Sequence, residues 1–369
     1  MRIIIIVHNL TGGGAERVAA LWATGFVKRG YDVGMVLNCS GDTPLTYQVP
    51  PTVKMYNLYG NPIISLIAGI LNRRLHYDGY YVRKLKRIFK SFKPDVIIGV
   101  LQPYAEWSRK ASKGMAVSII NTEHNSFERP KSAPMSVYEW RQKYKWNANY
   151  SLVTVLNNAD RICTEGYLNN VCVLPNPLAF TPHYDPFKKE KVILSAGRLD
   201  DWHYKGFDIL MKVWGKVAND FPDWRLEIAG KGSAQDVKRI ELMMIENGVY
   251  NRTTILGYQT NMIPIYQRSS IFLLTSRYEG FGMVLIEAMS QGVAPIACDY
   301  KGRQKEIISN ETEGVLVEPE DVEGIAHGLR ELLSNEAKRK NIQLNAVERS
   351  KYYNLDNTIN RWEEILKKI

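Results

Sequence analysis

Residues 3–37 read IIIIVHNLTGGGAERVAALWATGFVKRGYDVGMVL, and this stretch indicates how the chain folds. Residues 3–7 form an unbroken β-branched run, which is typical of a strand buried on both faces of a parallel sheet. Three glycines at 12–14 end this run, and apolar residues at helical spacing follow over residues 16–29. Gly30 ends the helix before a second apolar run at 33–37. Strand, glycine turn, helix and strand in this order predict a parallel βαβ unit.

The same alternation continues along the chain. Short apolar strands are expected at 95–100 and 118–121, and a second series begins near residue 191. Its strands are expected at 192–196, 226–229, 254–256, 271–275, 294–297 and 315–317. Its helices are expected at 207–218, 236–246, 283–290 and 322–333. The expected fold class is therefore α/β, with two doubly wound parallel-sheet domains in tandem.

A proline-rich polar stretch at 174–186 marks the expected hinge between the domains. The boundaries expected from it are an N-terminal domain at 1–176 and a C-terminal domain at 177–353. Residues 354–369 contain an amphipathic stretch with Ile359, Trp362, Ile365 and Leu366 on one side. We expect this terminal helix to pack back toward the N-terminal domain.

The composition is that of an ordinary globular protein. The 369 residues are 45% hydrophobic and 23% charged, which excludes a disordered or collagen-like chain. The four cysteines are scattered without metal-ligand spacing, which fits a reducing cytoplasm. The longest apolar stretch, at 62–71, is shorter than the ~20 residues that a spanning helix needs. The apolar run at the start is too short for a signal peptide.

Charge is divided unevenly between the two halves. The chain has a net charge of +10, and residues 1–175 hold 22 Lys or Arg against 11 Asp or Glu. One domain is thus expected to meet an anionic surface, although a mere effect on solubility is the alternative. At 62–93, apolar residues and tyrosines adjoin a basic cluster, which suits a membrane interface with anionic lipids. The alternative is a buried helix followed by a solvated basic helix. No nucleic-acid recognition motif accompanies these charges.

Gly12-Gly13-Gly14 follows the first strand and precedes a helix, so its N–H groups could attract an anion. The nicotinamide-dinucleotide fingerprint requires a third glycine where Arg17 stands, and an acid where Asn38 stands. A dinucleotide-dependent oxidoreductase is therefore a remote alternative. A tight turn without a ligand also remains open.

Two cations stand at strand ends in the second domain. Arg198 follows the strand expected at 192–196, and Lys205 comes just before a helix. A planar guanidinium and a compact ammonium that converge at one edge of a sheet suit a diphosphate. The alternative for this pair alone is two solvated surface charges.

The most informative motif runs from Glu279 to Glu287 and reads EGFGMVLIE. It follows an apolar strand and opens a helix, with Gly282 and Met283 at the helix N-terminus, where phosphate binds well. Two carboxylates separated by an anion-binding turn could hold a polyhydroxylated, phosphorylated ligand. A glycosidase-type acid pair is the rival interpretation, and the turn between the acids argues against it.

These motifs resemble those of family 4 of the retaining, nucleotide-sugar-dependent glycosyltransferases, which have the GT-B fold of two Rossmann-like domains facing across a cleft. The resemblance rests on the E-x7-E pattern at 279–287, together with segments at 13–17, 173–177 and 197–206, in the family's order. It covers essentially the whole chain. A non-catalytic basic binding protein would have no reason to carry these motifs in register.

The resemblance implies roles for matching residues. Arg198 and Lys205 would bind the diphosphate and stabilise the leaving group, Glu279 would contact the donor sugar, and Glu287 would hold the ribose hydroxyls. The other expected donor-binding residues would approach the phosphates and sugar, supply backbone contacts or border the base: Gly13, Gly14, Gly230, Lys231, Tyr258, Phe281, Gly282, Met283, Val284 and Leu285.

His124 follows a short apolar strand in the sequence NTEHNS. The family often carries a histidine in such a Glu-His context, so His124 is expected to contact the donor sugar. A structural hydrogen bond is the alternative. His8 adjoins the glycine turn and has less support, while His76, His183, His203 and His327 are expected at the surface.

No two aspartates are two positions apart, so the Asp-x-Asp motif by which other glycosyltransferases hold a metal is absent. The expected reaction is therefore metal-independent and needs no cofactor beyond the nucleotide sugar, with a UDP-sugar favoured. It would move a hexose or N-acetylhexosamine to a glycan acceptor. The resemblance implies that the N-terminal domain binds the acceptor and the C-terminal domain binds the donor. The basic charge of the N-terminal domain then favours an acceptor on a membrane lipid diphosphate, in polysaccharide biosynthesis at the cytoplasmic face of the membrane. A glycosyltransferase with a soluble acceptor is the runner-up.

Overall fold

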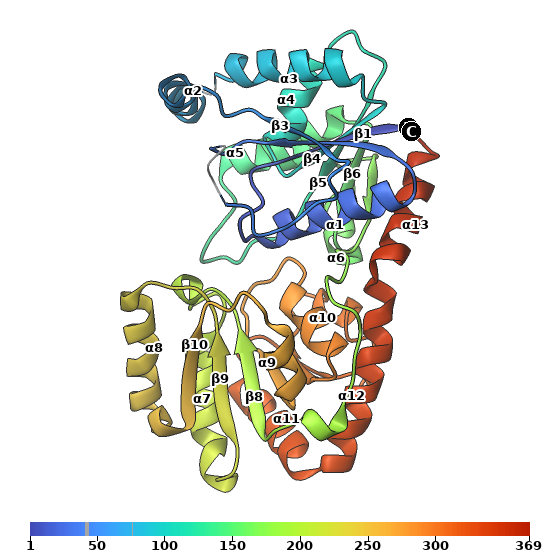
Figure 1. Ribbon diagram of the computed structural model, residues 1–369. Coiled ribbons are helices and arrows are strands. Elements are labelled where there is room, and N and C mark those ends of the chain that lie inside the picture. The colour runs from blue at the N-terminus through green and yellow to red at the C-terminus, as the bar shows by residue number, and fades with distance from the viewer. Residues whose placement is uncertain (41–43, 76) are drawn as a thin grey trace. The chain divides into compact units, whose positions relative to one another are not determined.

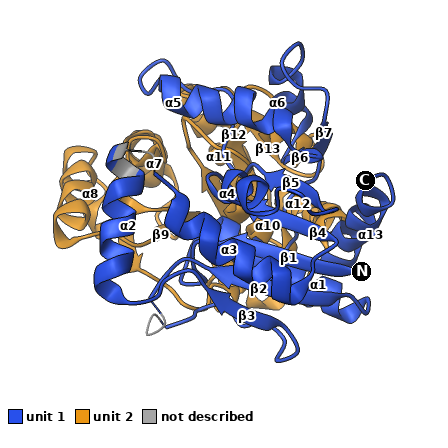
Figure 2. Cartoon of the chain, turned by 90° about the horizontal axis from the view of Figure 1, so that it is seen from above, with its two compact units in different colours: residues 1–179, 355–369 blue, residues 180–354 orange. Residues whose placement is uncertain are grey.

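The computed structural model describes residues 1–40, 44–75 and 77–369, which form two compact units (Figure 2). Unit 1 comprises Met1–Ala179 and Leu355–Ile369, and unit 2 comprises Phe180–Asn354. Each unit is built around its own parallel sheet, so the expected α/β class with two doubly wound sheets is confirmed (Figure 1). His76 lies outside the described residues.

Unit 1 has a seven-stranded sheet in the order β3-β2-β1-β4-β5-β6-β7. Its strands are β1 (Arg2–Val7), β2 (Asp32–Leu37), β3 (Lys54–Asn57), β4 (Val96–Val100), β5 (Ser118–Thr122), β6 (Leu152–Val155) and β7 (Val171–Val173). Its helices are α1 (Gly14–Lys28), α2 (Pro62–Leu75), α3 (Gly79–Phe92), α4 (Tyr104–Ala111), α5 (Val137–Trp140), α6 (Asn158–Cys163) and α13 (Leu355–Leu366).

Strand β1 forms the centre of this sheet because it is apolar on both faces. Residues 3–6 are fully buried, and β1 pairs in parallel with β2 on one side and β4 on the other. Ile4 and Ile6 pack in one cluster with Leu85 and Phe89 of α3, while α1 packs against β1, β2 and β4. The crossovers therefore change direction between β1 and β4, which is where a doubly wound sheet leaves room for ligands.

Helix α13 completes unit 1 from the far end of the sequence. Trp362 is fully buried, and its ring centroid lies 5.1 Å from that of Trp22 on α1. Gly25 of α1 permits this close packing, since a Cβ there would come within 2.4 Å of Ile359. The last helix thus belongs to the core of the unit that holds the first helix.

Unit 2 has a six-stranded sheet in the order β10-β9-β8-β11-β12-β13. Its strands are β8 (Val192–Ala196), β9 (Arg225–Ala229), β10 (Thr253–Gly257), β11 (Ile271–Leu274), β12 (Ala294–Cys298) and β13 (Val315–Val317). Its helices are α7 (Phe207–Val217), α8 (Ala234–Glu246), α9 (Ile263–Arg268), α10 (Met283–Ser290), α11 (Val322–Ser334) and α12 (Glu336–Ser350).

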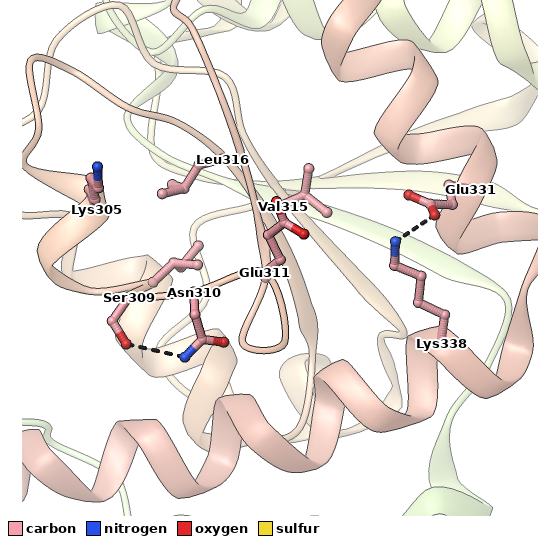
Figure 3. Close-up of a pocket in the computed structure, with 10 residues that line it drawn as sticks. Lys305, Ser309, Asn310, Glu311, Val315, Leu316, Glu331 and Lys338 are labelled. Carbon is pink, nitrogen blue, oxygen red and sulfur yellow. Dashed lines mark hydrogen bonds and ion pairs between the residues drawn. The ribbon is translucent and has the colours of Figure 1, made fainter.

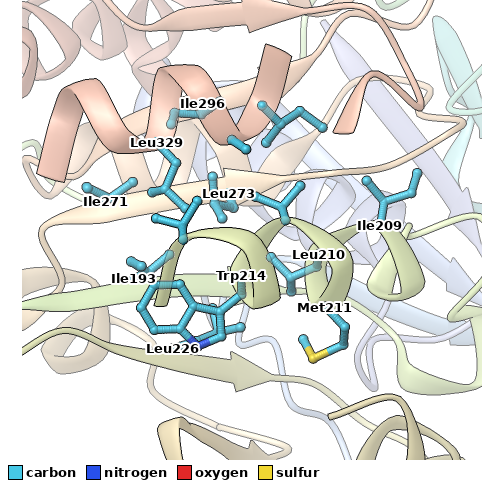
Figure 4. Close-up of a cluster of buried hydrophobic side chains, with 14 of the residues drawn as sticks. Ile193, Ile209, Leu210, Met211, Trp214, Leu226, Ile271, Leu273, Ile296 and Leu329 are labelled. Atoms are coloured by element: carbon cyan, nitrogen blue, oxygen red, sulfur yellow. The ribbon is translucent and has the colours of Figure 1, made fainter. Parts of the chain in front are cut away.

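The core of unit 2 joins helices α7 and α11 to one face of the sheet (Figure 4). Trp214 of α7 and Leu329 of α11 are both fully buried there, among strand residues such as Ile193, Leu226 and Leu273. Burial of a large apolar side chain stabilises the fold by roughly 1.5–3 kcal/mol. This packing fixes the strands whose carboxyl ends carry the motifs at 197–206 and 279–287.

The loops at those carboxyl ends are tied closely to one another. Gly206, the N-cap of α7, has a φ of +68°, and a Cβ on it would lie 1.9 Å from the carbonyl oxygen of Thr275. The Thr275 hydroxyl in turn donates to the Gly206 carbonyl at 2.9 Å. The loop after β8 and the loop after β11 therefore touch through backbone, and only glycine fits at the contact.

We expect Gly206→Ala to destabilise unit 2 more than Gly248→Ala does. Gly248 is the matched control, because its φ is +70° but a Cβ there would meet nothing within 4 Å. Both changes incur the cost of a left-handed backbone, about 1–2 kcal/mol. Only Gly206→Ala adds a backbone clash, typically another ~1–3 kcal/mol. Urea unfolding of the two variants would measure the difference, and equal midpoints would refute the loop contact.

Candidate functional site

The motifs of unit 2 meet where its crossovers change direction. Strands β8 and β11 are neighbours in the sheet, although 74 residues separate Lys205, in the loop after β8, from Glu279, in the loop after β11. Because the carboxyl ends of parallel strands lie at one edge, these loops are brought together there. The sequence motifs at 197–206 and 279–287 therefore form one site.

Lys205 and Glu279 are bonded directly. The Lys205 Nζ donates to Glu279 Oε1 at 2.7 Å, and the Ser276 hydroxyl donates to the same oxygen at 2.9 Å. The two charged side chains are 23% and 11% exposed, so the pair is largely withdrawn from water. A partly desolvated ammonium beside a carboxylate is suited to bind a polar ligand that carries both phosphate and hydroxyl groups.

Arg198 lies at the same edge but is much more exposed. Its Nε lies 3.2 Å from Asp200 Oδ1, and its side chain is 68% exposed. Burial raises the pKa of the neighbouring Asp201 carboxyl, against the opposing effect of Lys205 and Arg198. Arg198 is thus a largely exposed cation that can turn toward an incoming anion, whereas Lys205 is held in position by its hydrogen bond to Glu279.

Helix α10 begins at this edge with its positive end. Its N-cap, Gly282, has a φ of +96°, which favours glycine. Phe281 and Leu285 are buried, and Met283 and Val284 are partly exposed. Of the residues expected to supply backbone contacts, Phe281 and Gly282 directly precede α10 and Met283 begins it, at the helix end where amide groups attract anions.

Glu287 lies one turn further into α10 and is only 4% exposed. Its Oε2 accepts a hydrogen bond from the Tyr266 hydroxyl of α9 at 3.2 Å. Tyr266 was not expected from the sequence, because it stands 21 positions before Glu287 and outside every motif. It fixes the orientation of the second carboxylate.

Gly230, Lys231 and Tyr258 stand on adjoining loops after β9 and β10. The Gly230 amide donates to the Gly257 carbonyl at 2.9 Å, and the Leu199 amide donates to the Lys231 carbonyl at 2.8 Å. Tyr258 is 53% exposed. The structure therefore places all the residues expected in the C-terminal domain's site on loops and a helix end at the carboxyl edge of one sheet.

In unit 1, the glycine turn is already engaged by its own helix. Glu16 reaches back so that its Oε2 accepts from the Gly13 amide at 2.6 Å and from the Gly12 amide at 3.2 Å. Gly14 is the first residue of α1. A carboxylate thus occupies the position at which the sequence predicts an anion, and a phosphate would compete with Glu16 for these amides.

His124 follows β5 and is held by a buried polar network. Its Nε2 lies 3.1 Å from Thr122 Oγ1, and its ring centroid lies 5.7 Å from that of Trp22. Burial lowers the pKa of His124 to about 4, against the opposing effects of Glu123 and Asn176. The imidazole is therefore neutral at neutral pH, as a hydrogen-bonding group rather than a cation.

The adjacent Glu123 is buried with Lys143, and their side chains are each 5% exposed. Lys143 Nζ donates to Glu123 Oε2 at 3.0 Å, and the amides of Asn121 and Asn147 donate to Glu123 Oε1 at 2.9 and 3.0 Å. Burial pushes the pKa of Glu123 upward, but Lys143 and the amides outweigh it and hold that pKa low. Glu123 is thus an ionised anchor for the backbone beside His124.

Two polar atoms near His124 lack well-aligned partners. Among the described residues, neither His124 Nδ1 nor the buried Oδ1 of Asn176 makes such a hydrogen bond. Asn176 belongs to the segment at 173–177 that resembles the family, but no local pattern assigned it a role. Asn176 nevertheless acts on the pKa of His124 through a side-chain hydrogen bond, so these two side chains lie next to each other.

The remaining histidines divide as follows. His8 Nδ1 lies 3.1 Å from the Tyr104 hydroxyl, at the carboxyl end of β1. His183, His203 and His327 are exposed. In the part of the chain that the structure describes, no group of three or more His, Cys, Asp or Glu side chains could hold a metal ion.

A cavity of about 480 Å³ lies beside edge strand β13 and is separate from these motifs (Figure 3). Lys305, Ser309 and Glu311 line it, together with the ion pair between Glu331 and Lys338. None of the expected site residues lines it. Its position does not alter the assignment of the site to the loops after β8 and β11.

Two family models match the chain in succession. The model described as Glycosyltransferase Family 4 matches residues 12–178, and the model described as Glycosyl transferases group 1 matches residues 181–349. An uncharacterized glycosyltransferase of Haemophilus influenzae is 28% identical, with 99% of this chain and 99% of the relative covered.

A second relative comes from Campylobacter jejuni and is a GalNAc-alpha-(1->4)-GalNAc-alpha-(1->3)-diNAcBac-PP-undecaprenol alpha-1,4-N-acetyl-D-galactosaminyltransferase. It is 25% identical, with 100% of this chain and 99% of the relative covered. The solved structure of Anabaena Alr3699/HepE in complex with UDP and glucose superposes with a TM-score of 0.79 at 19% identity, over 100% of both chains. This likeness confirms the GT-B fold. The two family models, which in succession match residues 12–178 and 181–349, show that the chain belongs to family 4 of the glycosyltransferases.

Proposed function

We propose that this glycosyltransferase moves a hexose or N-acetylhexosamine from a UDP-sugar to a glycan acceptor carried on a lipid diphosphate, with retention of configuration and without a metal ion. The observation that carries the proposal is the bonded pair of Lys205 and Glu279 at the carboxyl edge of the unit 2 sheet. In this pair, a cation that could bind phosphate lies beside a carboxylate that could accept hydrogen bonds from sugar hydroxyls.

The donor is proposed to bind on unit 2. Lys205, Arg198 and the first turn of α10 would hold the diphosphate, and Glu279 would accept from hydroxyls of the sugar. Glu287, oriented by Tyr266, would accept from the ribose hydroxyls. Gly230, Lys231 and Tyr258 would border the base. The Anabaena structure with UDP and glucose supports a uridine nucleotide.

The acceptor is proposed to bind on unit 1. The name of the Campylobacter relative includes a PP-undecaprenol-linked glycan, which supports a lipid-linked acceptor and polysaccharide biosynthesis for this chain as well. Gly13, Gly14 and His124 would approach the donor sugar from this unit. The cytoplasmic face of the membrane is where we propose that such a reaction takes place.

The proposed reaction breaks the bond between the anomeric carbon and the diphosphate and forms a bond from the acceptor oxygen on the same face. The acceptor hydroxyl proton passes to an oxygen of the departing diphosphate. Lys205 and Arg198 stabilise the negative charge that develops on that leaving group. Neutral His124 can bond to a sugar hydroxyl without adding a like charge beside an electron-poor anomeric centre.

Thermal unfolding with UDP-, GDP- and ADP-sugars, each with and without a chelator, tests the donor class. A donor at 100 times its Kd should stabilise the protein by ~2.7 kcal/mol. We expect stabilisation by a UDP-sugar that the chelator leaves unchanged, and sugar transfer that persists in the chelator. Activity lost in the chelator and restored by manganese would contradict metal independence, and a preference for GDP-sugars would overturn the uridine assignment.

Arg198→Ala and Lys205→Ala are expected to lower kcat about 10²–10³-fold, as removal of a group that stabilises developing charge typically does. Donor Kd should change much less, because the charge to be stabilised increases as the bond breaks. Lys191→Ala is the matched control, since Lys191 is an exposed, ion-paired cation just before β8, at the strand's opposite end. Steady-state kinetics and donor titration of the three variants would separate the effects. Near-normal kcat in both site variants would refute the assigned roles.

The low pKa of His124 predicts how stability depends on pH. The folded protein resists protonation of this imidazole down to pH about 4, whereas the unfolded chain binds the proton below about 6.5. Unfolding is therefore favoured progressively as pH falls from 6.5 to 4, by up to ~3 kcal/mol.

His124→Gln should flatten this part of the profile, and His327→Gln, at an exposed position, should not. Urea midpoints at pH 4.5, 5.5 and 7.5 would measure the slopes. An equally steep decline in His124→Gln would show that other groups cause the acid sensitivity.

A further inference from the structure

Helix α2 of unit 1 exposes its large aliphatic side chains to solvent. Ile63, Ile64, Leu66, Ile67 and Ile70 are 69%, 52%, 58%, 52% and 40% exposed. On a helix that only covers the core of a water-soluble protein, such residues would face inward. The alternative that residues 62–71 form a buried helix is therefore wrong.

The small residues of α2 provide its attachment to the unit. Ser65 and Ala68 are each 6% exposed, and Ala68 shares a core cluster with Tyr81 and Leu85 of α3. The Asn61 side chain accepts from the Ile63 and Ile64 amides at 3.0 and 3.3 Å. The helix is thus fixed in place by its small face, and its large aliphatic face is left in solvent.

Helix α3 lies next to α2 and presents charge. Its apolar residues Tyr81, Leu85 and Phe89 are buried, whereas Arg83, Lys86, Arg87 and Lys90 are exposed on the other side. Residues 44–94 contain nine Lys or Arg and a single acid, Asp78. That acid is bonded to Lys110 at 2.5 Å, so it does not balance the exposed face of α3.

We propose that the aliphatic face of α2 and the basic face of α3 together form a docking surface for an anionic lipid bilayer. A contiguous aliphatic patch in water is unfavourable and marks a surface that is covered in use. At a membrane, aliphatic residues enter the boundary between headgroups and acyl chains, while flanking Lys and Arg bind headgroup phosphates. This inference rests on the proposed function, and it names the surface that would bind the membrane in which the lipid-linked acceptor lies.

Charge argues for the bilayer over a second copy of the chain. In a symmetric dimer the same patch occurs on both sides, so two basic α3 helices would be brought close together and repel. A nucleic acid would balance the positive charge of α3 but would leave the five aliphatic side chains of α2 in water. Only an anionic bilayer satisfies both halves of the surface. Among the described residues, no helix is long and apolar enough to cross a membrane.

Co-sedimentation with vesicles tests the proposal on the intact protein. Vesicles of phosphatidylcholine with 30–40% phosphatidylglycerol, a range chosen as roughly that of anionic membranes, would be compared with phosphatidylcholine alone. We expect binding to the anionic vesicles and little to the neutral ones. Arg83→Gln with Arg87→Gln should weaken partitioning about 25-fold, since each basic residue near an anionic surface contributes about five-fold. Raising the salt should reduce binding of the wild type.

The aliphatic half has its own variant and control. The aliphatic variant combines Ile63→Gln, Leu66→Gln and Ile67→Gln. It should weaken the vesicle binding that remains in high salt at least ten-fold, because three apolar side chains no longer enter the bilayer. Leu242→Gln with Ile245→Gln on α8 of unit 2 is the matched control, since these side chains are 51% and 59% exposed. That control should bind as the wild type does. All variants change exposed residues and should keep the wild-type unfolding midpoint.

Three outcomes would overturn the proposal. The first is that the wild type does not bind anionic vesicles. The second is that the α2 and α3 variants bind these vesicles as well as the wild type does. The third is that sedimentation analysis finds a dimer in the wild type and none in the α2 variant, which would assign the face to a second copy. Donor binding by thermal shift, measured on the same samples without vesicles, keeps the two hypotheses apart. A protein that binds vesicles but no nucleotide sugar refutes the proposed function alone, and the reverse result refutes the docking surface alone.

Discussion

The contact between the loops after β8 and β11 is the constraint on which the unit 2 site depends. Gly206 and Thr275 meet through backbone, with a Cβ excluded by a 1.9 Å approach to a carbonyl oxygen. That approach brings the Lys205 ammonium to 2.7 Å from the Glu279 carboxylate. The attraction between the two charges offsets part of the free energy that their desolvation costs. A donor needs only to replace one partner of each charge.

Unit 1 handles buried charge differently. Glu123 and Lys143 are fully enclosed and bonded to amides and carbonyls, including Lys143 Nζ to the Asn125 carbonyl at 3.0 Å. A buried pair of this kind is weak evidence for stability, but loss of one partner leaves an uncompensated charge. Its value lies in fixing the backbone on both sides of His124.

Much of the fold was predictable because parallel strands buried on both faces leave a clear apolar signature. The strands at 192–196 and 315–317 and the helix at 283–290 lie where they were expected. Strands β3, β6 and β7 were not predicted. β3 is a half-exposed edge strand with Lys54 in it, and β7 has only three residues, so neither gives a continuous apolar run. Helix α12 was missed because its sequence is mostly polar.

The candidate site residues that the sequence indicates are those that lie in contiguous motifs. Glu279 and Glu287 stand in one segment, so spacing alone relates them. Tyr266, Asn176 and Lys143 take part through tertiary packing, and no local pattern connects them to the groups that they contact. Sequence reasoning finds the loops that follow strands and misses the side chains that orient them from neighbouring elements.

Helix α2 shows where periodicity cannot decide. At 3.6 residues per turn, the aliphatic residues at 63, 64, 66, 67 and 70 fall within an arc of roughly 160°, and such an apolar stripe is predicted to face the core. The opposite side of the helix faces the core, because Ala68 packs in one cluster with Tyr81 and Leu85 while the large aliphatic residues stay exposed. The large residues are therefore directed outward by packing. The basic face of α3 beside them makes the exposed aliphatic surface consistent with a lipid bilayer, where apolar contact and anionic charge occur together.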